Sequence, residues 1–154
     1  MKFREAKDED WKQISQIFND YWGQGFDSKL NLSLKTKFNN RHAFYNFWVI
    51  EKESKILGWS ASFRVFESPL RENCNADLCI YVNKNSLAKG VGNLLMKKTI
   101  SLLKTSEIKL VFGHIEPNNL ISKKMAKRHG FTYSNIEYKN SIHYNTVELW
   151  LLSL

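Results

Sequence analysis

The spacing of apolar side chains predicts alternating strands and helices from the first residues onward. Residues 2–6, KFREA, have the composition of a short strand. A helix is predicted next, because apolar residues recur there every three or four positions, at Trp11, Ile14, Ile17, Phe18 and Tyr21. Asp8 stands just before this run, where its side chain can cap the helix. Two further acids follow it at the positive end of the helix dipole.

The middle of the chain is dominated by strand patterns. A second helix is predicted for residues 34–40, before these patterns begin. Residues 47–66 then have the pattern of two strands joined by a turn at residues 52–55. Residues 76–82, ADLCIYV, form a further predicted strand, with Leu78, Ile80 and Val82 on one face.

The C-terminal part alternates more regularly. A helix is predicted from Val91, with its buried side formed by Val91, Leu94, Leu95, Leu102 and Leu103. Residues 108–115 form a strand, and residues 118–131 hold a short helix that starts at an asparagine cap and ends at Gly130. Residues 146–154 close the chain as a strand. This alternation predicts an α/β fold with a mixed sheet, and the absence of linkers and repeats predicts one domain over residues 1–154.

Composition limits the class of protein. A chain of 154 residues with 43% hydrophobic residues is large enough for one domain with a real core. No apolar run approaches the roughly 18 residues of a membrane span, and the N-terminus has no apolar signal-peptide core. We therefore expect a cytoplasmic protein with no membrane partner. Two cysteines, Cys74 and Cys79, form neither a disulfide framework nor a zinc site.

The net charge of +8 predicts an anionic partner, which could be nucleic acid or a phosphorylated small molecule. A non-enzymatic module that binds nucleic acid would carry a stripe of Lys and Arg with interleaved aromatics. The basic residues of this chain are scattered instead. We therefore expect no nucleic-acid partner.

Two glycines indicate where an anionic partner could bind. Gly90 and Gly92 lie in the segment AKGVGNLLMKK, between the strand that ends at Val82 and the helix that begins near Val91. The first N–H groups of a helix are unpaired and lie at the positive end of its dipole, so a phosphate can bind them where no Cβ is in the way. Lys89 adds a positive charge. The alternative is an ordinary tight turn between strand and helix.

A second motif lies downstream. Asn119 and Ser122 stand three residues apart, and Gly130-Phe131 follows eight residues after Ser122. Together with the glycine turn, this pattern resembles the Gcn5-related N-acetyltransferase (GNAT) superfamily. Its pyrophosphate-binding motif, Gln/Arg-x-x-Gly-x-Gly/Ala, corresponds to residues 87–92. Within the superfamily, residues 58–63, 76–82 and 144–154 are most similar to the phosphinothricin and methionine-sulfoximine acetyltransferase branch.

The resemblance implies a fold, a reaction and a cofactor. The fold would be a single α/β domain with a mostly antiparallel sheet, flanking helices and splayed central strands. The reaction would be acetyl transfer from acetyl-CoA to the amine of a small amino-acid-like acceptor by direct attack; a protein or ribosomal amine is the alternative. A homodimer is compatible with the family. The implied cofactor-binding residues are Tyr81, Val82, Asn83, Lys89, Gly90, Val91, Gly92, Asn93, Asn119, Ser122 and Lys124, with Lys123 beside the last. The backbone of residues 81–83 would also supply the donor for the oxyanion.

Two positions depart from the family pattern. Leu87 stands where the family has Gln or Arg, so one phosphate contact is missing, and Lys89 is available to replace it. Ala126 stands where many members have a tyrosine that protonates the leaving thiolate. Tyr133 or Tyr138 could replace that acid; the alternative is that both pack on the sheet.

The acceptor amine needs a base, because alkyl amines have a pKa of about 10 and are mostly protonated at neutral pH. In the branch that this chain resembles, an acidic residue near the start of the fourth strand takes the proton, and Asp77 falls at that position. The alternative is an exposed aspartate at a strand end. Glu116 is a second candidate, although its segment also fits a helix entry.

The remaining candidates are interpreted as structural. The four histidines show no metal-ligand spacing, so we expect no metal site. Tyr21, Trp22 and Gly23, at the end of the first predicted helix, could line the acceptor pocket; core packing is the alternative.

Overall fold

The computed structural model describes residues 1–23, 25, 28–65, 73–86, 88–139 and 145–154. Leu87 lies outside these residues, as does His143. Among the described residues, no helix combines the length and the apolar character needed to cross a membrane.

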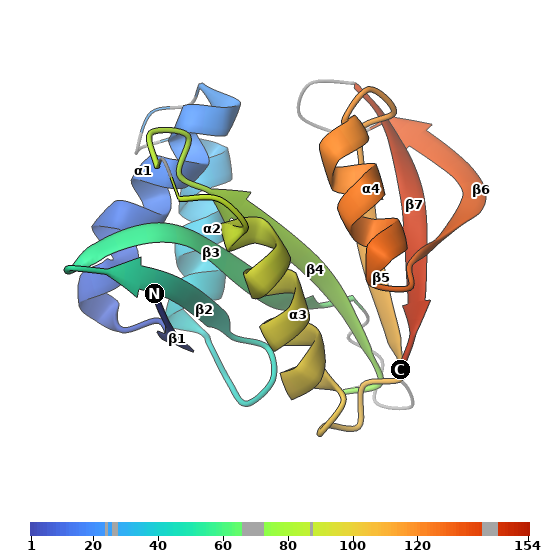
Figure 1. The fold of residues 1–154 in the computed structure, drawn as a ribbon, viewed down its shortest axis with the longest axis horizontal. Helices are drawn as coiled ribbons and strands as arrows, with labels where there is room; N and C mark the ends of the chain where they lie inside the picture. The colour runs from blue at the N-terminus through green and yellow to red at the C-terminus, as the bar shows by residue number, and fades with distance from the viewer. Residues whose placement is uncertain (24, 26–27, 66–72, 87, 140–144) are drawn as a thin grey trace.

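The described strands form one seven-stranded sheet in the order β1-β2-β3-β4-β5-β7-β6 (Figure 1). Neighbouring strands are antiparallel except for β4 and β5, which are parallel. This confirms the mixed, mostly antiparallel sheet predicted from the sequence. The strands are β1 (Lys2–Glu5), β2 (Phe47–Lys52), β3 (Lys55–Arg64), β4 (Asn75–Val82), β5 (Leu110–Ile115), β6 (Thr132–Lys139) and β7 (Thr146–Ser153).

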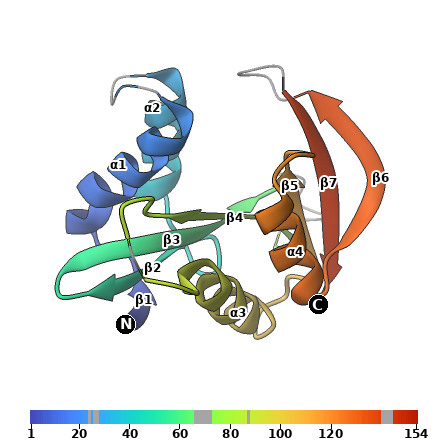
Figure 2. The same ribbon diagram turned by 45° about the horizontal axis from the view of Figure 1, so that its top comes forward.

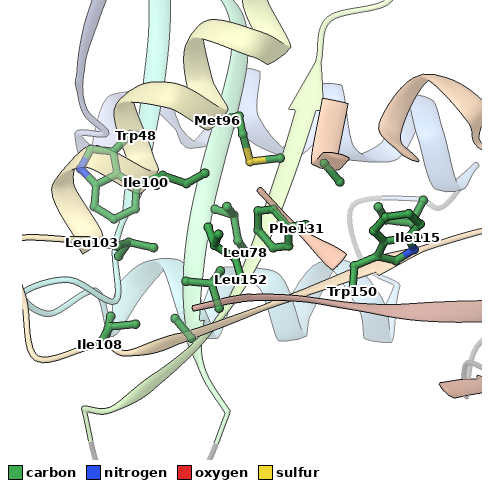
Figure 3. Close-up of a cluster of buried hydrophobic side chains, with 13 residues drawn as sticks. Trp48, Leu78, Met96, Ile100, Leu103, Ile108, Ile115, Phe131, Trp150 and Leu152 are labelled. Atoms are coloured by element: carbon green, nitrogen blue, oxygen red, sulfur yellow. The ribbon is translucent and has the colours of Figure 1, made fainter. Parts of the chain in front are cut away.

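Within the described residues, four α-helices cover the sheet on two sides (Figure 1). They are α1 (Trp11–Trp22), α2 (Lys29–Asn39), α3 (Val91–Leu103) and α4 (Leu120–Arg128). On one side, α1 and α2 pack on an apolar cluster that includes Phe47, Val49 and Trp59. On the other, α3 and α4 pack on a cluster that holds Trp48, Leu78 and Trp150, shown in Figure 3. Because side chains alternate along β2, its buried residues contribute to both clusters.

The central strands separate, as the family resemblance implies. The ladder between β4 and β5 consists of Asn75↔Leu110, Ala76↔Val111 and Asp77↔Phe112. Beyond Asp77, β4 stays paired with β3 as far as Val82, and β5 stays paired with β7 as far as Ile115. Figures 1 and 2 show β4 and β5 diverging in a V above this point. Asp77 is therefore the last β4 residue before the V opens.

Most predicted elements are confirmed, but the N-terminal ends of two helices differ from the prediction. The predicted cap at Asp8 is wrong, because a 3₁₀ turn over Asp8–Asp10 precedes α1 and the Asp8 carboxylate accepts from Arg41 instead, at 2.7 Å. Asp10 accepts the N–H of Lys7 and is buried against Arg4. Helix α2 begins at Lys29, five residues before its predicted start, with Ser28 as its cap.

Strand β6 was not predicted. Its residues are mostly exposed, so it carries no apolar alternation. Its pairing with β7 is also interrupted by a register shift, within which Asn135 has a positive φ of 63°. An edge strand of this kind has no pattern that the sequence reveals.

Candidate active site

The turn before α3 has the geometry of an anion site. Gly90 has a φ of +81° and is followed by the first intrahelical bond, from Leu94 N to Gly90 O at 2.9 Å. The N–H groups of Val91, Gly92 and Asn93 therefore precede the helical ladder, and Gly90 has no side chain to cap them. Three consecutive N–H groups at the positive end of a helix can bind a phosphate.

The two glycines of this turn are needed for different reasons. A Cβ at Gly90 would have no described atom within 4 Å, so glycine is needed there for its left-handed backbone. A Cβ at Gly92 would lie 3.3 Å from Val82 Cγ2 and 3.5 Å from Met125 Sδ. Gly92 therefore lies where the end of β4, the start of α3 and the middle of α4 meet.

Basic residues of the turn itself and of α4 lie near the start of α3. Lys89 and Lys124 are exposed. Lys124 is one helical turn before Arg128, whose Nη1 lies 3.5 Å from Asn93 Oδ1 in the first turn of α3. Arg128 was not among the predicted residues, although its four-residue spacing from Lys124 was visible in the sequence. Lys123 points elsewhere: its Nζ donates to the buried Glu148 carboxylate at 2.8 Å and to Pro117 O at 3.2 Å. Its charge is therefore already paired.

The three predicted polar residues on and beside α4 have local partners. Asn119 Oδ1 accepts the N–H of Ser122 at 3.0 Å, so Asn119 is the N-cap of α4. Ser122 is partly exposed and stands three residues before Met125, on the face that approaches Gly92. Asn93 Oδ1 lies 2.8 Å from His129 Nε2, which ties the first turn of α3 to the end of α4. Asn93 thus offers its backbone N–H to a ligand while its side-chain oxygen is engaged.

The end of β4 offers fewer free backbone donors than the resemblance implied. Asn83 N donates to Leu57 O at 2.9 Å, so this N–H faces the β3 side. Backbone groups alternate between the two edges of a strand, so the N–H of Tyr81 also faces β3 and that of Val82 faces the open V. Tyr21 Oη donates to Val82 O at 2.9 Å and joins the end of α1 to this edge. Of residues 81–83, Val82 alone therefore presents its N–H to the V.

Asp77 is joined to two side chains from other strands. His114 Nε2 lies 2.8 Å from Asp77 Oδ1, and Tyr138 Oη lies 2.5 Å from His114 Nδ1. Asp77 and His114 are each about one third exposed, at 34% and 35% of their side chains. Burial and the charge of Asp77 raise the pKa of Tyr138 above its usual value, which keeps its hydroxyl protonated.

His114 was missed because the histidines were searched only for metal-ligand spacing. The signal was the alternation of β5, in which Val111, Gly113 and Ile115 are buried while His114 is exposed. Among the described residues, no group of three His, Cys, Asp or Glu side chains could hold a metal ion. Glu116 lies past the end of β5, where its carboxylate accepts from Asn145 Nδ2 at 3.3 Å.

An apolar pocket of about 200 Å³ lies on the face that α1 and α2 cover, and it reaches as far as Phe63. Phe63 of this pocket pairs directly with Asp77 across β3 and β4. Lys37 lies at the pocket with its Nζ 5.2 Å from the Phe63 ring. The lining residues are Phe18, Trp22, Leu30, Ser33, Leu34, Lys37, Trp59, Phe63, Cys79 and Tyr81.

The aromatic residues of the pocket hold one another in place. The Tyr81 ring stacks on Trp59 at 4.7 Å, and its hydroxyl accepts from Trp22 Nε1 at 3.0 Å. Burial raises the pKa of Tyr81 and that of Cys79, so both stay neutral at physiological pH. Tyr21 packs edge-on against Tyr81 at 5.4 Å, with Lys84 Nζ 4.2 Å from its own ring. Trp22 is thus a pocket residue, and Tyr21 supports the pocket from behind Tyr81.

The position of the missing tyrosine provides no acid. Ala126 is 2% exposed and belongs to the apolar cluster under α4. Tyr133 packs on Trp150, and its hydroxyl donates to Glu137. Tyr138 is the tyrosine on the Asp77 side, and its hydroxyl is bound to His114.

Three solved acetyltransferases share this fold. The ribosomal-protein-alanine N-acetyltransferase from Brucella melitensis has a TM-score of 0.81 at 19% identity, with 100% of both chains covered. An N-acetyltransferase from Staphylococcus aureus Mu50 has a TM-score of 0.79 at 21% identity, covering 99% of this chain and 97% of that one. The phosphinothricin acetyltransferase from Sinorhizobium meliloti, in complex with acetyl-CoA, has a TM-score of 0.76 at 14% identity, covering 99% and 88%.

At such low identity these structures establish the fold alone. The assignment to a family depends on a match of the sequence itself. No curated protein sequence matches the chain. The sequence model of the acetyltransferase (GNAT) family, however, matches residues 11–131, from the first residue of α1 to the end of the α4 segment. Because this match takes in both the glycine turn and the Gly130-Phe131 motif, the chain belongs to the acetyltransferase (GNAT) family.

Proposed function

We propose that the protein acetylates the amine of a small amino-acid-like acceptor by direct attack, as in the phosphinothricin acetyltransferase branch. As a member of its family it is an N-acetyltransferase that uses acetyl-CoA. The observation that carries the proposal is the small apolar pocket beside Asp77, with Lys37 at the same pocket. A cation, a carboxylate and an apolar cavity together match the three groups of an amino acid.

The residues present fit coenzyme A. The N–H groups of residues 91–93 can donate hydrogen bonds to one phosphate, and Lys89, Lys124 and Arg128 supply positive charge around them. Val82 presents a backbone N–H to the V between β4 and β5. When bound, acetyl-CoA supplies the thioester whose acetyl group is transferred.

The pocket indicates which kind of acceptor could bind. A cavity of about 200 Å³ is large enough for one apolar side chain and too small for a folded partner. Lys37 can pair with the acceptor's carboxylate, and Asp77 can receive its ammonium group. The acceptor would thus lie with its amine at the vertex of the V.

Asp77 is the proposed proton acceptor. Once the ammonium group has given one proton to the carboxylate, the neutral amine can form the C–N bond as the C–S bond breaks, and the second proton that the nitrogen then loses goes to solvent. The thiolate leaves toward solvent and needs little assistance, because thiols titrate near ~8.5. The N–H of Val82 is the proposed donor to the carbonyl oxygen as its charge develops.

The proposal includes one acetyltransferase domain over residues 1–154, located in the cytoplasm. Whether it acts as a monomer or as a homodimer does not affect the site described above, because one chain contributes every residue named in it.

A screen for thiol release from acetyl-CoA tests the function. The panel holds apolar amino acids, phosphinothricin-like compounds, polyamines and peptides, including peptides that begin with alanine. We expect turnover with amino-acid-like acceptors, and Lys37→Met should raise their KM about tenfold through the lost ion pair. Lys35→Met is the matched control, because Lys35 lies over Trp11 rather than at the pocket. Turnover with peptides alone would contradict the small-molecule acceptor and favour a protein or ribosomal amine.

A further inference from the structure

His114 contacts the Asp77 carboxylate directly, and Tyr138 contacts His114. We propose that His114 and Tyr138 are positioning residues that fix the Asp77 carboxylate for proton acceptance and bridge the two strands of the V. The inference rests on the proposed function, because it assigns the support of its base. It uses two residues that carry no role in the mechanism given above.

The direction of the two hydrogen bonds follows from the chemistry of the groups. An ionised carboxylate only accepts, so His114 Nε2 must carry the proton that lies between it and Asp77 Oδ1. A neutral imidazole then has its lone pair on Nδ1, and the Tyr138 hydroxyl donates to it. Tyr138 thereby selects the histidine tautomer that can donate to Asp77.

These two hydrogen bonds leave one oxygen of the Asp77 carboxylate for the acceptor. Asp77 Oδ1 is held by the imidazole, and Oδ2 belongs to a side chain that is about one third exposed. A carboxylate held at one oxygen has fewer rotamers, so its second oxygen keeps a fixed direction. For a base that must meet an amine at hydrogen-bond distance, this fixed direction is the contribution that His114 makes.

The contact also requires the sheet order of this fold. Strand β7 lies between β5 and β6, so the backbones of β5 and β6 are about 9–10 Å apart, two strand spacings. His114 pairs with Leu149 and Tyr138 pairs with Val147, two residues along β7 on the same face. The Tyr138 ring therefore crosses β7 to reach the imidazole, and the two rings meet edge to face at 5.8 Å.

The hydrogen-bonded side chains of Asp77, His114 and Tyr138 also cross the V at its vertex. Backbone pairing between β4 and β5 ends at Asp77↔Phe112, and His114 lies two residues beyond Phe112 on the same face of β5. The bond from His114 to Asp77 therefore continues the connection between the strands after the backbone ladder stops. Without it, the separation of β4 and β5 at the first step of the V would depend more heavily on the buried cluster of the opposite face.

The titratable groups around His114 are few in the described part of the chain. Asp77 of β4 and Tyr138 of β6 contact it directly, Cys79 follows Asp77 on the same face of β4, and Glu116 lies beyond the end of β5. Cys79 stays neutral because burial raises its pKa, and Glu116 is engaged with Asn145. Asp77 is thus the anion that the imidazole N–H meets.

Two substitutions at His114 separate positioning from packing. His114→Leu fills a similar space without a donor, whereas His114→Gln keeps an N–H that can reach Asp77. We expect His114→Leu to lower kcat about tenfold to a hundredfold, within the contribution of general-base catalysis. Its KM for acetyl-CoA should change less than twofold, and His114→Gln should restore part of kcat. Tyr138→Phe should lower kcat by a smaller factor, while Tyr133→Phe, whose hydroxyl binds Glu137, should leave kcat unchanged.

Nitrogen-15 NMR of the histidines gives a readout that needs no turnover. His114, assigned as the signal lost in His114→Gln, should show the Nε2–H tautomer, and Tyr138→Phe should make the tautomers mix. An Nδ1–H tautomer in the wild-type protein, or an active wild type with unchanged kcat in His114→Leu, would overturn this inference alone. A wild type that binds acetyl-CoA by calorimetry and acetylates no small acceptor would overturn the proposed function, and this inference with it.

Discussion

Replacing Gly90 and Gly92 one at a time would separate the structural role of the turn before α3 from its role in binding. For Gly90→Ala, the added Cβ meets no described atom within 4 Å, but the residue keeps a φ of +81°. An L-residue in this region costs roughly 1–2 kcal/mol. At about 2–4 °C per kcal/mol for a chain of this size, the melting temperature should fall by about 2–8 °C.

For Gly92, the expected cost falls on the ligand. Its φ is helical and alanine improves helix propensity by up to about 1 kcal/mol, which offsets the tight 3.3 Å contact with Val82. Gly92→Ala should therefore leave the melting temperature nearly unchanged. In Gly92→Val the methyl carbons reach about 1.5 Å further than Cβ, into the space between β4, α4 and the open N–H groups. We expect overpacking of about 1–3 kcal/mol and a large loss of acetyl-CoA affinity.

Thermal denaturation with and without acetyl-CoA measures both effects together. A ligand at 100 times its Kd stabilises the native state by about 2.7 kcal/mol, which raises the melting temperature of the wild type by about 5–10 °C. Gly90→Ala should keep most of that rise from a lower starting point, and Gly92→Val should lose it. A folded Gly92→Val protein that keeps the full rise and an unchanged Kd by calorimetry would show that the turn is only architectural.

Four further predictions concern charge. Lys124→Ala should raise the KM for acetyl-CoA several-fold, about 1 kcal/mol. Lys123→Ala should lower the urea unfolding free energy by about 1–3 kcal/mol, because the buried Glu148 carboxylate then loses its cation and keeps only the hydrogen bond from Trp150. The hydrogen bond from Lys123 holds the pKa of Glu148 below its usual value, so this carboxylate stabilises the fold above about pH 4.3 and loses that contribution as the pH falls through its folded pKa. Glu148→Gln should therefore flatten the fall of the urea midpoint between about pH 5 and pH 3, and an unchanged slope would contradict this pairing. At ~0.15 M salt, coenzyme A should bind and a short DNA duplex should not, as measured by competition titration.

Local chemistry explains what the sequence predicted well. The glycine turn was readable because its geometry depends on residues that are adjacent in the chain, a left-handed Gly90 followed by open N–H groups. The orientation of Asp77 was readable from the alternation of its own strand. In both cases the deciding geometry spans fewer than ten residues.

Buried polar residues explain part of what was missed. The first turns of α2 contain Asn31, which is 1% exposed because its side-chain oxygen accepts from Ser15. A search for apolar periodicity counts such a residue as surface, so the predicted helix began too late. The cap of α1 was misplaced for a related reason, since Asp10 is buried by its pairing with Arg4, 6 residues earlier.

Contacts across the sheet explain the rest. His114 lies 37 residues after Asp77, and Tyr138 lies 24 residues after His114. Asp77 and His114 meet because β4 and β5 pair in parallel, and Tyr138 reaches His114 across β7, which lies between β5 and β6; the chain order β5-β6-β7 gives no hint of this strand order. Spacing in the sequence carries no information on such a contact, so residue type alone could not have identified His114.

Different contacts on the two faces of the sheet hold β4 and β5 in place above their short ladder. Three residue pairs join β4 to β5, yet the V above them has to hold its shape around a ligand. On the face of α3 and α4, one buried cluster runs from Leu78 on β4 through Met96 to Ile115, Phe131 and Trp150 beyond the V (Figure 3). Opening the V on that side would expose this apolar surface to water, at roughly 25 cal/mol for each Å². On the other face lies the proposed acceptor site, and an apolar bridge there would block it. Hydrogen bonds from His114 and Tyr138 can span that side while staying open to solvent, which is why we expect the support of the base and the support of the V to be the same side chains.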